Sequence, residues 1–456
     1  MPSPARVAAF HALRAVSAGR ADLPATLAHA RQRLRDDRDR ALAAEIVIGT
    51  LRRQRTLDHL IVRFAQRPLH RIDDDVLTIL RLSLYQILHL DRVPAAAVVD
   101  DAVDLTRGAR KPAAAGFVNA VLRAALRQRH RLPLPPRPST PDDRDAAVAY
   151  LGIAHSHPDW LVARWLARHG FDAAERWVRF NNEAPPLTLR VNRLRATRQR
   201  AQAILAADGI ETTPTRYAPD GLTVTAGNPL RRQPDGLFVV QDEASQLVTL
   251  AVGAAAGNRV LDLCASPGGK TTAMAADMTD AGLIVACDVR PRRLALLADT
   301  VRLSGARSIR LVRVDPAGGL PFRAAFDRVL VDAPCSGLGT IRRDPDIRWR
   351  RREQDLAAFA RSQIDLLLRA ADAVAPGGRL VYATCSSEPE ENDQVVERFL
   401  AHRRDFSLLD LRGRCHAALE AVLDSRGMLR TLPPVHGLEA FFAAALGRSI
   451  EPAIAG

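Results

Sequence analysis

The chain has 456 residues, of which 47% are hydrophobic and 25% charged, an ordinary globular composition for two or three domains. Its 65 Lys and Arg against 51 Asp and Glu give a net charge of +14, which favours a polyanionic partner. The five cysteines form no CxxC pair, and no run approaches the ~18 apolar residues of a membrane span. These features exclude a disulfide framework, a zinc site and a transmembrane protein, and we expect a cytoplasmic monomer without a metal.

Residues 1–131 predict an all-α bundle, because apolar residues recur at three- and four-residue spacings and strand signals are absent. We expect the long segment Asp39–Gln66 to break into two helices. Residues 1–150 carry 25 basic and 16 acidic side chains, so the charge favours either a solvated helical face or a docking surface for RNA or protein. The predicted helices are Ala5–Val16, Leu23–Leu34, Asp39–Gln66, Asp74–Leu88, Ala95–Thr106 and Ala114–Arg127.

Residues 132–143 hold five prolines and predict an extended linker. Residues 144–235 predict a small α+β domain, in which a helical stretch, Ala146–Phe180, precedes a strand, a helix and two further strands. This order is similar to that of RNA-binding sheets, but their aromatic stacking residues are missing, so RNA contact stays open here. The later elements of this domain are Leu187–Asn192, Arg198–Asp208, Glu211–Tyr217 and Leu222–Ala226.

Residues 236–456 alternate strands and helices, which predicts a doubly wound, mostly parallel, Rossmann-like sheet. Ligands of such sheets bind at the carboxyl ends of the strands. The predicted strands are Val260–Leu263, Leu283–Asp288, Ile309–Val314, Arg328–Val331, Arg379–Ala383 and Glu439–Ala444, and the helices are Lys270–Met278, Pro291–Leu303 and Gln354–Ala373.

The stretch Val260–Thr272, VLDLCASPGGKTT, predicts a strand, a glycine-rich turn and a helix start that together form a nucleotide seat. Cys264 occupies the position where a phosphate-binding loop requires glycine, and the pattern GxGxxG is also absent. Asp288 ends the next strand, where a carboxylate binds ribose hydroxyls. A ligand with a ribose but no phosphates fits this pattern, and we predict S-adenosylmethionine, with Asp315 facing the adenine.

Two cysteines follow apolar strands and enter polar loops, Cys335 in VLVDAPCS and Cys385 in VYATCSS. A thiolate that adds to C6 of cytosine makes C5 nucleophilic enough to take a methyl group from a sulfonium, so thiols beside a methyl donor favour cytosine-C5 methylation. Asp332 is placed to hold or protonate the base at N3. Sequence spacing does not decide which cysteine is the nucleophile. We expect Cys287 to be a core residue and Cys415 to be structural, in a helical segment.

The loop IRRDPDIRWRRR, residues 341–352, follows the first of these cysteines and is rich in arginine. Arginine binds phosphates, and tryptophan or arginine faces stack on unpaired bases, so we predict an RNA contact here rather than a solvated loop. The predicted RNA-binding residues are Arg342, Arg343, Arg348, Trp349 and Arg350.

These motifs resemble those of the Sun/Fmu family of RNA cytosine-C5 methyltransferases, and most closely the bacterial 16S ribosomal RNA methyltransferase B group. The likeness covers nearly the whole chain and includes LDLCASPGGKTT, VLVDAPCSGLGTIRRDPDIRW, VYATCSSEPEENDQVV, VVQDEASQL and PPLTLRVN. The N-terminal stretches GTLRRQRTLDHLI and GFVNAVLR are similar to the NusB-type RNA-binding domain of that group. Where the family has Asp-Gly before Phe-Phe, this chain has Glu439-Ala440.

The resemblance implies that Cys385 is the nucleophile and that Cys335 assists release of the methylated RNA. It implies that Asp288 binds the ribose of the cofactor and that Asp315 and Asp332 make further cofactor contacts. The implied cofactor loop comprises Cys264, Ala265, Ser266, Pro267, Gly268, Gly269 and Lys270.

The function implied by the resemblance is methylation of one cytosine of 16S rRNA through a covalent cysteine adduct. We expect the partner to be that RNA or a small-subunit assembly intermediate. Two alternatives stay open: the same chemistry on transfer RNA, and a non-catalytic RNA-binding assembly factor.

Overall fold

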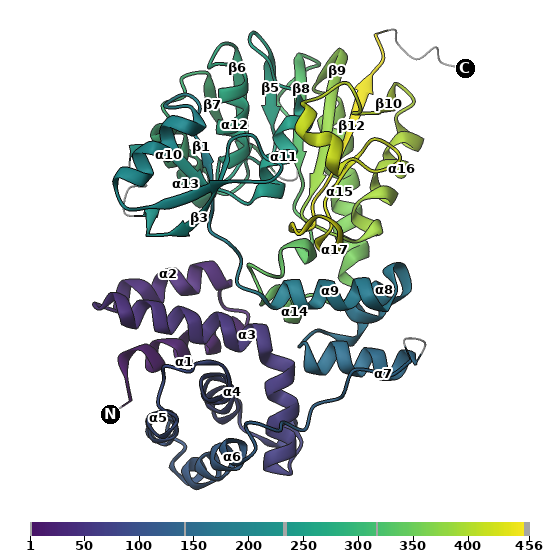
Figure 1. Cartoon of the computed structure of the whole chain (residues 1–456). Coiled ribbons are helices and arrows are strands. Elements are labelled where there is room, and N and C mark those ends of the chain that lie inside the picture. The colour runs from purple at the N-terminus through teal and green to yellow at the C-terminus, as the bar shows by residue number, and fades with distance from the viewer. Residues whose placement is uncertain (1, 141–142, 231–234, 316–317, 451–456) are drawn as a thin grey trace. The chain divides into compact units, whose positions relative to one another are not determined.

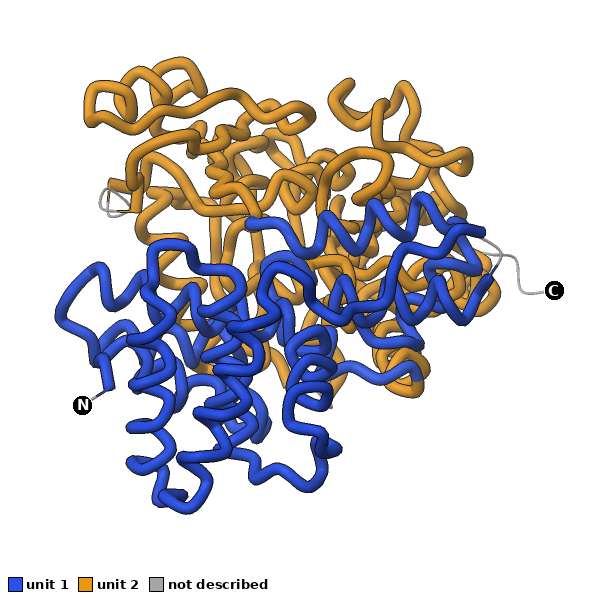
Figure 2. Tube along the Cα trace, turned by 60° about the horizontal axis from the view of Figure 1, so that its bottom comes forward, with its two compact units in different colours: residues 1–184, 341–353 blue, residues 185–340, 354–456 orange. Residues whose placement is uncertain are grey.

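A computed structural model describes residues 2–140, 143–230, 235–315 and 318–450. The chain forms two compact units (Figure 2): unit 1 comprises Met1–Ala184 and Ile341–Glu353, and unit 2 comprises Pro185–Thr340 and Gln354–Gly456. The division differs from the predicted domains, because the helices after the proline-rich linker belong to unit 1 and the small sheet belongs to unit 2. In the described residues, no helix has both the length and the apolarity needed to cross a membrane.

Unit 1 begins with a helical bundle around an apolar core (Figure 1). The predicted break in the third helix is wrong, since α3 runs unbroken from Asp37 to Ala65. Gly49 lies inside α3, where a Cβ atom would overlap the Tyr85 ring of α4, so this glycine permits close helix packing. The other helices are α1 (Pro4–Ser17), α2 (Leu23–Arg33), α4 (Asp74–His89), α5 (Ala95–Gly108) and α6 (Ala115–Arg127).

The helical stretch predicted at Ala146–Phe180 is divided into several shorter pieces. Gly170, with φ of +76°, separates the last two helices, because this left-handed backbone suits glycine. Trp165 and Trp177 are buried and stack with ring centroids 4.8 Å apart, so they hold these helices together. The pieces are α7 (Arg144–Ala149), a π-helical turn (Tyr150–Ala154), α8 (Asp159–His169) and α9 (Phe171–Asn182).

The segment Ile341–Glu353, with the short helix α14 (Ile347–Arg350), is anchored in unit 1 by Arg348. The Arg348 side chain is fully buried. Its Nη1 donates to the Ser156 carbonyl at 2.8 Å and to Asn182 Oδ1 at 3.1 Å, and its Nη2 donates to the Asn181 carbonyl at 3.2 Å. Burial lowers the pKa of the guanidinium, but these acceptors compensate for part of the lost hydration.

Unit 2 contains a four-stranded antiparallel sheet in the order β2-β3-β1-β4. Its apolar residues pack with α10 (Arg198–Ala207) in a small core. The last strand lies beyond the boundary predicted at residue 235, because Phe238–Val240 pairs with β1 and therefore belongs to the small sheet. The strands are β1 (Thr188–Val191), β2 (Glu211–Pro214), β3 (Gly221–Ala226) and β4 (Phe238–Val240).

The larger sheet of unit 2 has the order β10-β12-β9-β8-β5-β6-β7, and β11 pairs with β12 (Figure 1). Strands β5 to β9 are parallel, while β10, β11 and β12 join by antiparallel pairing. The predicted parallel strands are present, whereas β10 and β11 were not predicted. Bounds are β5 (Arg259–Asp262), β6 (Leu283–Asp288), β7 (Ile309–Arg313), β8 (Phe326–Asp332), β9 (Val374–Thr384), β10 (Phe406–Leu409), β11 (Leu429–Arg430) and β12 (Phe442–Arg448).

Alternating side chains of this sheet enter two separate cores, as the period of two in a strand requires. On β5, Val260 belongs to one core and Leu261 to the other. Because β5, β6, β8 and β9 run in parallel, their carboxyl ends lie along one edge of the sheet. The helices of this unit are α11 (Glu243–Val252), α12 (Gly269–Asp277), α13 (Pro291–Ser304), α15 (Asp355–Ala371), α16 (Asp393–His402) and α17 (Pro433–His436).

We predict that Arg348→Ala lowers the free energy of unfolding of unit 1 by about 3 kcal/mol, because it leaves several buried carbonyl groups without a donor. All four tryptophans, at positions 160, 165, 177 and 349, lie in unit 1, so tryptophan fluorescence during urea unfolding reports on this unit alone. The matched control is the exposed Arg352→Ala, with an expected change of at most about 0.5 kcal/mol. Equal effects of the two variants would contradict a structural role for Arg348.

Candidate active site

The turn between β5 and α12 depends on a glycine. Gly268 caps α12 with φ of +105°, which only glycine adopts readily. A Cβ atom there would lie 2.8 Å from Leu297 Cδ1 and 3.1 Å from Thr300 Cβ, so the turn also lies too close to α13 for a side chain. Ser266, whose bond to Pro267 is cis, donates from Oγ to the Arg293 carbonyl at 3.0 Å. The contacts of Gly268 and Ser266 with α13 therefore hold this turn in place.

The small sheet supports this turn through Arg190 of β1, which is buried. Its Nη2 donates to the Gly269 carbonyl at 3.0 Å and to Thr272 Oγ1 at 2.8 Å. Its Nε donates to Gln241 Oε1 at 2.7 Å. Arg190 was not predicted as a site residue, and its only sequence signal was its place in the PPLTLRVN motif.

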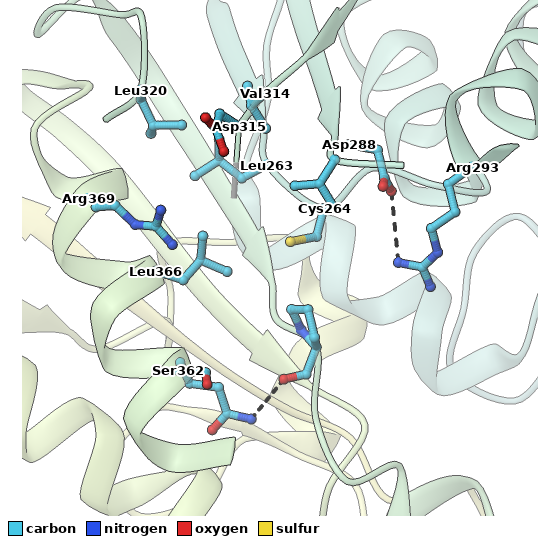
Figure 3. A pocket seen from close by; sticks show the side chains of 13 residues that line it. Leu263, Cys264, Asp288, Arg293, Val314, Asp315, Leu320, Ser362, Leu366 and Arg369 are labelled. Atoms are coloured by element: carbon cyan, nitrogen blue, oxygen red, sulfur yellow. Dashed lines mark hydrogen bonds and ion pairs between the residues drawn. The ribbon is translucent and has the colours of Figure 1, made fainter. Parts of the chain in front are cut away.

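A cavity of about 220 Å³ opens beside the turn, at the carboxyl ends of β5, β6 and β7 (Figure 3). Three of the predicted cofactor residues, Cys264, Asp288 and Asp315, line it. Burial, assisted by the charge of Asp332, raises the pKa of the Cys264 thiol, so this cysteine stays neutral. Apolar side chains, among them Leu263, Val289, Val314, Leu320 and Leu366, form much of the remaining wall. Four polar side chains also line the cavity: Arg293, Ser362, Gln363 and Arg369.

Asp288 presents an unsatisfied acceptor at this cavity. Its side chain is buried, and Oδ1 accepts the backbone N–H of Arg290 at 3.2 Å. Oδ2 has no hydrogen-bond partner among the described residues, although Arg293 Nη1 lies 3.9 Å from it in an ion pair. A buried acceptor of this kind is suited to a ligand hydroxyl.

Asp262, at the end of β5, is a second buried carboxyl group, and it was missed as a site residue. Oδ2 accepts a hydrogen bond from Thr271 Oγ1 at 2.7 Å, while Oδ1 has no partner among the described residues. Burial raises the pKa of Asp262 to about 7, against the effect of the Thr271 hydrogen bond. The signal that could have identified it is the one used for Asp288, an acidic residue that ends a parallel strand.

Lys270 and Asp332 form an ion pair at the same edge of the sheet. Lys270 Nζ lies 2.7 Å from Asp332 Oδ2 and 5.8 Å from the centre of the Phe441 ring. Burial is the largest single effect and acts to lower the pKa of Lys270. The charge and the hydrogen bond of Asp332, with smaller contributions from Cys385 and Asp262, together outweigh it and raise that pKa, so the lysine is an ammonium. The pair is placed to orient a polar ring through one donor and one acceptor.

The two loop cysteines meet beyond the ends of β8 and β9. Asp332 pairs with Ala383 in the parallel register, so both loops leave the sheet at the same level. The Sγ atoms of Cys335 and Cys385 lie 3.2 Å apart, and both side chains are half-buried. The pKa of Cys335 is raised well above its usual value by the hydrogen bond with Cys385, then by burial and by nearby negative charge.

The remaining cysteines lie elsewhere in unit 2. The prediction for Cys287 is confirmed, since it is fully buried in the sheet core and burial raises its pKa to about 12. Cys415 does not lie in a helix; it lies in a turn before a short 3-10 helix (Ala417–Val422), where its Sγ donates to the Leu411 carbonyl at 3.0 Å. No group of three or more His, Cys, Asp or Glu side chains within the described ranges could hold a metal ion.

The five predicted RNA-binding residues all belong to unit 1. The prediction is wrong for Arg348, because its fully buried guanidinium binds carbonyl and amide groups of the protein. Trp349 packs on the bundle core and donates from Nε1 to the Leu51 carbonyl at 2.7 Å. Arg342 donates to the Ala184 carbonyl at 2.9 Å. For Arg343 and the exposed Arg350, RNA contact stays a prediction.

Comparison with known proteins gives matches along the whole chain. Residues 249–447 match the family model "16S rRNA methyltransferase RsmB/F", residues 3–127 match the NusB family, and residues 157–231 match the RsmF/B-like ferredoxin-like domain. The probable ribosomal RNA small subunit methyltransferase B of Bacillus subtilis is 34% identical over 90% of this chain and 91% of its own. The ribosomal RNA small subunit methyltransferase B of Pseudomonas putida is 36% identical over 89% and 91%.

The chain belongs to the ribosomal RNA small subunit methyltransferase B family. This family is S-adenosylmethionine-dependent, and its NusB-like, ferredoxin-like and Rossmann-like parts confirm the predicted fold class. Among solved structures, PH0851 superposes with a TM-score of 0.79 at 25% identity over 98% of this chain and 99% of that one. A methyltransferase homolog from Pyrococcus horikoshii gives a TM-score of 0.56 at 26% identity over 66% and 99%.

We predict that Asp262→Asn becomes increasingly stabilising as the pH rises. In the folded state Asp262 has a pKa of about 7, above that of an unfolded aspartate, so the native protein binds an extra proton between those values and loses stability as the pH increases through them. Asparagine removes this penalty and still accepts from Thr271. Relative to the wild type, the variant should gain about 3 kcal/mol between roughly pH 5 and pH 8.

Scanning calorimetry at several pH values measures this gain, and tryptophan fluorescence identifies the transition of unit 1, because unit 2 contains no tryptophan. Arg348→Ala provides a contrast, since its loss of stability should not follow the titration of Asp262. A pH-independent difference between Asp262→Asn and the wild type would contradict the raised pKa.

Proposed function

We propose that this methyltransferase transfers a methyl group to C5 of one cytosine in 16S rRNA through a covalent cysteine–C6 adduct, with S-adenosylmethionine as the methyl donor. The observation that carries the proposal is the 3.2 Å contact between the Sγ atoms of Cys335 and Cys385. These two thiols follow neighbouring strands whose next neighbour, β5, leads into the glycine turn and the cavity. Lys270 and Asp332 lie at the same edge.

The cavity fits the cofactor that the family uses. The unsatisfied Oδ2 of Asp288 is suited to a ribose hydroxyl, and the apolar wall around Val289 and Val314 is suited to an adenine ring. When bound, S-adenosylmethionine supplies an electrophilic methyl group on a sulfonium. Asp315 and the turn from Cys264 to Lys270 are proposed to hold the remainder of the cofactor.

Cys385 is proposed as the nucleophile. Only a thiolate attacks efficiently, and the resemblance of the TCS loop to that of the family supports Cys385 rather than Cys335 for this role. The Cys385 sulfur forms a bond with C6 of the cytosine, and the electron pair of the 5,6 double bond shifts to make C5 nucleophilic. Asp332 and Lys270 hold the base edge, where charge develops at N3 and O2.

After methyl transfer, the proton on C5 leaves to a base, the C5–H electron pair re-forms the 5,6 double bond, and the Cys385 thiolate departs from C6. Cys335 is proposed to assist this last step, which its contact with the leaving sulfur supports. The target base must leave its stack to reach the thiols, as in other enzymes that modify bases. We propose that the basic helical unit holds the RNA, or a small-subunit assembly intermediate, and that one protomer suffices.

We predict that Cys385→Ala abolishes methylation of 16S rRNA while binding of S-adenosylmethionine stays within about threefold of wild type, because the thiol forms the adduct and does not line the cofactor cavity. Transfer of labelled methyl groups to 16S transcripts and to transfer RNA, with equilibrium dialysis for the cofactor, measures both quantities. Cys415→Ala is the matched control and should keep wild-type activity.

Three outcomes would contradict the proposal in different ways. Methylation by Cys385→Ala would exclude this cysteine as nucleophile. Preferential methylation of transfer RNA by the wild type would change the substrate. A wild type that binds RNA but not the labelled cofactor would favour a non-catalytic assembly factor.

We predict that Cys335→Ala accumulates a covalent protein–RNA adduct, because elimination of Cys385 from C6 is slowed while its addition proceeds. Denaturing gels of the reaction with 16S rRNA and cofactor should show a band of reduced mobility, and the double variant with Cys385→Ala should not. Normal turnover by Cys335→Ala without an adduct would exclude the release role.

A further inference from the structure

A fully buried carboxylate lies directly behind the two reactive cysteines. Glu391 belongs to a short 3-10 turn (Pro389–Glu391) that follows the second cysteine loop, and its side chain has no solvent exposure. An isolated carboxylate is costly to bury, so its surroundings must compensate for the lost hydration. The acidic stretch SEPEEN around it resembles a solvated loop in sequence, and the proposed reaction assigns it no role.

Four hydrogen bonds converge on the Glu391 carboxylate. Oε1 accepts the backbone N–H of Ser336 at 2.8 Å and Nε2 of Gln363 at 3.0 Å. Oε2 accepts the hydroxyl groups of Ser336 at 2.5 Å and Ser386 at 2.6 Å. The two serines directly follow Cys335 and Cys385 in the chain, so one side chain ties together the loops that carry both thiols.

We propose that Glu391 is a positioning residue that sets the distance between the Cys335 and Cys385 sulfurs. The proposal rests on the proposed function in one respect, that both thiols act in one turnover. Because hydrogen bonds to a charged acceptor are short and strong, the carboxylate restricts each loop more tightly than the single Ser336–Ser386 hydroxyl contact of 3.2 Å would. A displacement of about 1 Å at a reacting group costs on the order of 100-fold in rate.

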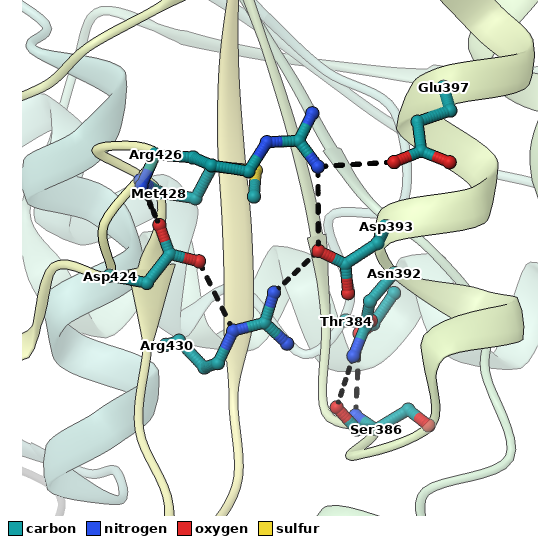
Figure 4. A network of polar contacts seen from close by, with 9 residues as sticks. All are labelled: Thr384, Ser386, Asn392, Asp393, Glu397, Asp424, Arg426, Met428 and Arg430. Carbon is teal, nitrogen blue, oxygen red and sulfur yellow. Dashed lines mark hydrogen bonds and ion pairs between the residues drawn. The ribbon is translucent and has the colours of Figure 1, made fainter.

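The backbone that presents Glu391 is itself held on both sides. The Tyr382 hydroxyl donates to the Glu391 carbonyl at 2.6 Å. Asn392 accepts from Thr384 Oγ1 at 2.6 Å and donates to the Ser386 carbonyl at 2.9 Å (Figure 4). The carboxylate is therefore offered from a rigid segment, as a positioning group requires.

The next residue along the chain extends this anchor to a neighbouring strand. Asp393 accepts from Arg430 Nη2 at 2.8 Å, and Arg430 Nε donates to Asp424 Oδ2 at 3.2 Å (Figure 4). Arg430 lies on β11, which pairs with β12 at Phe442, and its guanidinium lies 4.9 Å from the centre of the Phe442 ring. Glu391, Asn392 and Asp393 thus connect the cysteine loops to β11 and β12, the antiparallel strands of the sheet.

The charge of Glu391 also acts on the Cys335 thiol. It adds to the hydrogen bond with Cys385 and to burial in raising the pKa of Cys335. The carboxylate thereby supports a protonated Cys335 next to the proposed nucleophile.

The test uses the full-length protein and follows disulfide closure between Cys335 and Cys385 by diamide, without RNA or cofactor. Mass spectrometry quantifies the cross-linked peptide over time. In Glu391→Ala we expect closure about tenfold slower than in wild type and kcat for methylation about 100-fold lower, with binding of S-adenosylmethionine within about threefold. Glu397→Ala, which removes an exposed carboxylate from the following helix, should match the wild type in each measurement.

Glu391→Gln tests whether the hydrogen bonds of the Glu391 side chain, and not only its volume, are needed for rapid disulfide formation. Its amide oxygen accepts from Ser336 N–H and Gln363, and its amide NH₂ donates to the serine hydroxyls, so closure should recover to within about threefold of wild type. If Glu391→Ala does not fold, the double variant Ser336→Ala with Ser386→Ala replaces it in the test. This variant removes the two hydroxyl groups that donate to Glu391 and keeps the carboxylate. In that variant, too, the disulfide between Cys335 and Cys385 should form more slowly than in the wild type.

The outcomes separate this proposal from the proposed function. The positioning role would be overturned if the disulfide formed in Glu391→Ala as fast as in the wild type, even if the wild type methylates cytosine. If Glu391→Ala does not fold, the same result in the double serine variant would overturn it. Slow closure in the variants together with a wild type that methylates no cytosine would retain the positioning role and remove the proposed function.

Discussion

The parallel pairing of β8 with β9 is the constraint on which the site depends. Because the two strands run in the same direction with Asp332 opposite Ala383, both chains leave the sheet at one edge and deliver their cysteines to one point. A register that buries the apolar side chains of both strands therefore brings the two cysteine loops together. The hydrophobic effect that stabilises the sheet thus also determines where the chemistry occurs.

The same edge concentrates carboxyl groups, and this concentration has an electrostatic consequence. Asp262, Asp288 and Asp332 end three strands of the sheet, and Lys270 is paired with the last of them. Full burial raises the pKa of Asp262 to about 7, so the site accommodates several acids without all of them carrying a charge. Asp288, at the end of the neighbouring strand, keeps an oxygen without a hydrogen-bond partner among the described residues, which is available to a polar ligand.

Local patterns in the sequence predicted the fold class correctly, and they singled out Cys264, Asp288 and Asp315, which line the cavity, and the two cysteines whose sulfurs are in contact. Strand ends, the glycine turn and both cysteine loops are encoded within short stretches, so their convergence follows from the rule that parallel strands end at one edge. The arginine-rich loop shows where this reasoning fails. Arg348 satisfies carbonyl and amide groups of segments that lie more than 160 residues earlier in the chain, and no local pattern distinguishes such a buried arginine from a phosphate-binding one. The same holds for Arg190, whose partners lie more than 50 residues away, and for Glu391, which binds Ser336 55 residues earlier in the chain.

The arginine-rich loop has a structural role in unit 1, although the chain on either side of it belongs to unit 2. Residues 341–353 pack in unit 1, yet they are joined to unit 2 at both ends, and Cys335 lies six residues before the segment begins. Arg348 and Trp349 fix this segment to α3, which carries arginines of the basic bundle. The loop sequence therefore contributes to the structure of the proposed RNA-holding unit, while the cysteine loop just before it is fixed by the Glu391 carboxylate. Residues 335–353 thus contribute to both units. Their first part, the cysteine loop, is held by hydrogen bonds to Glu391, and their second part by those of Arg348 and Trp349.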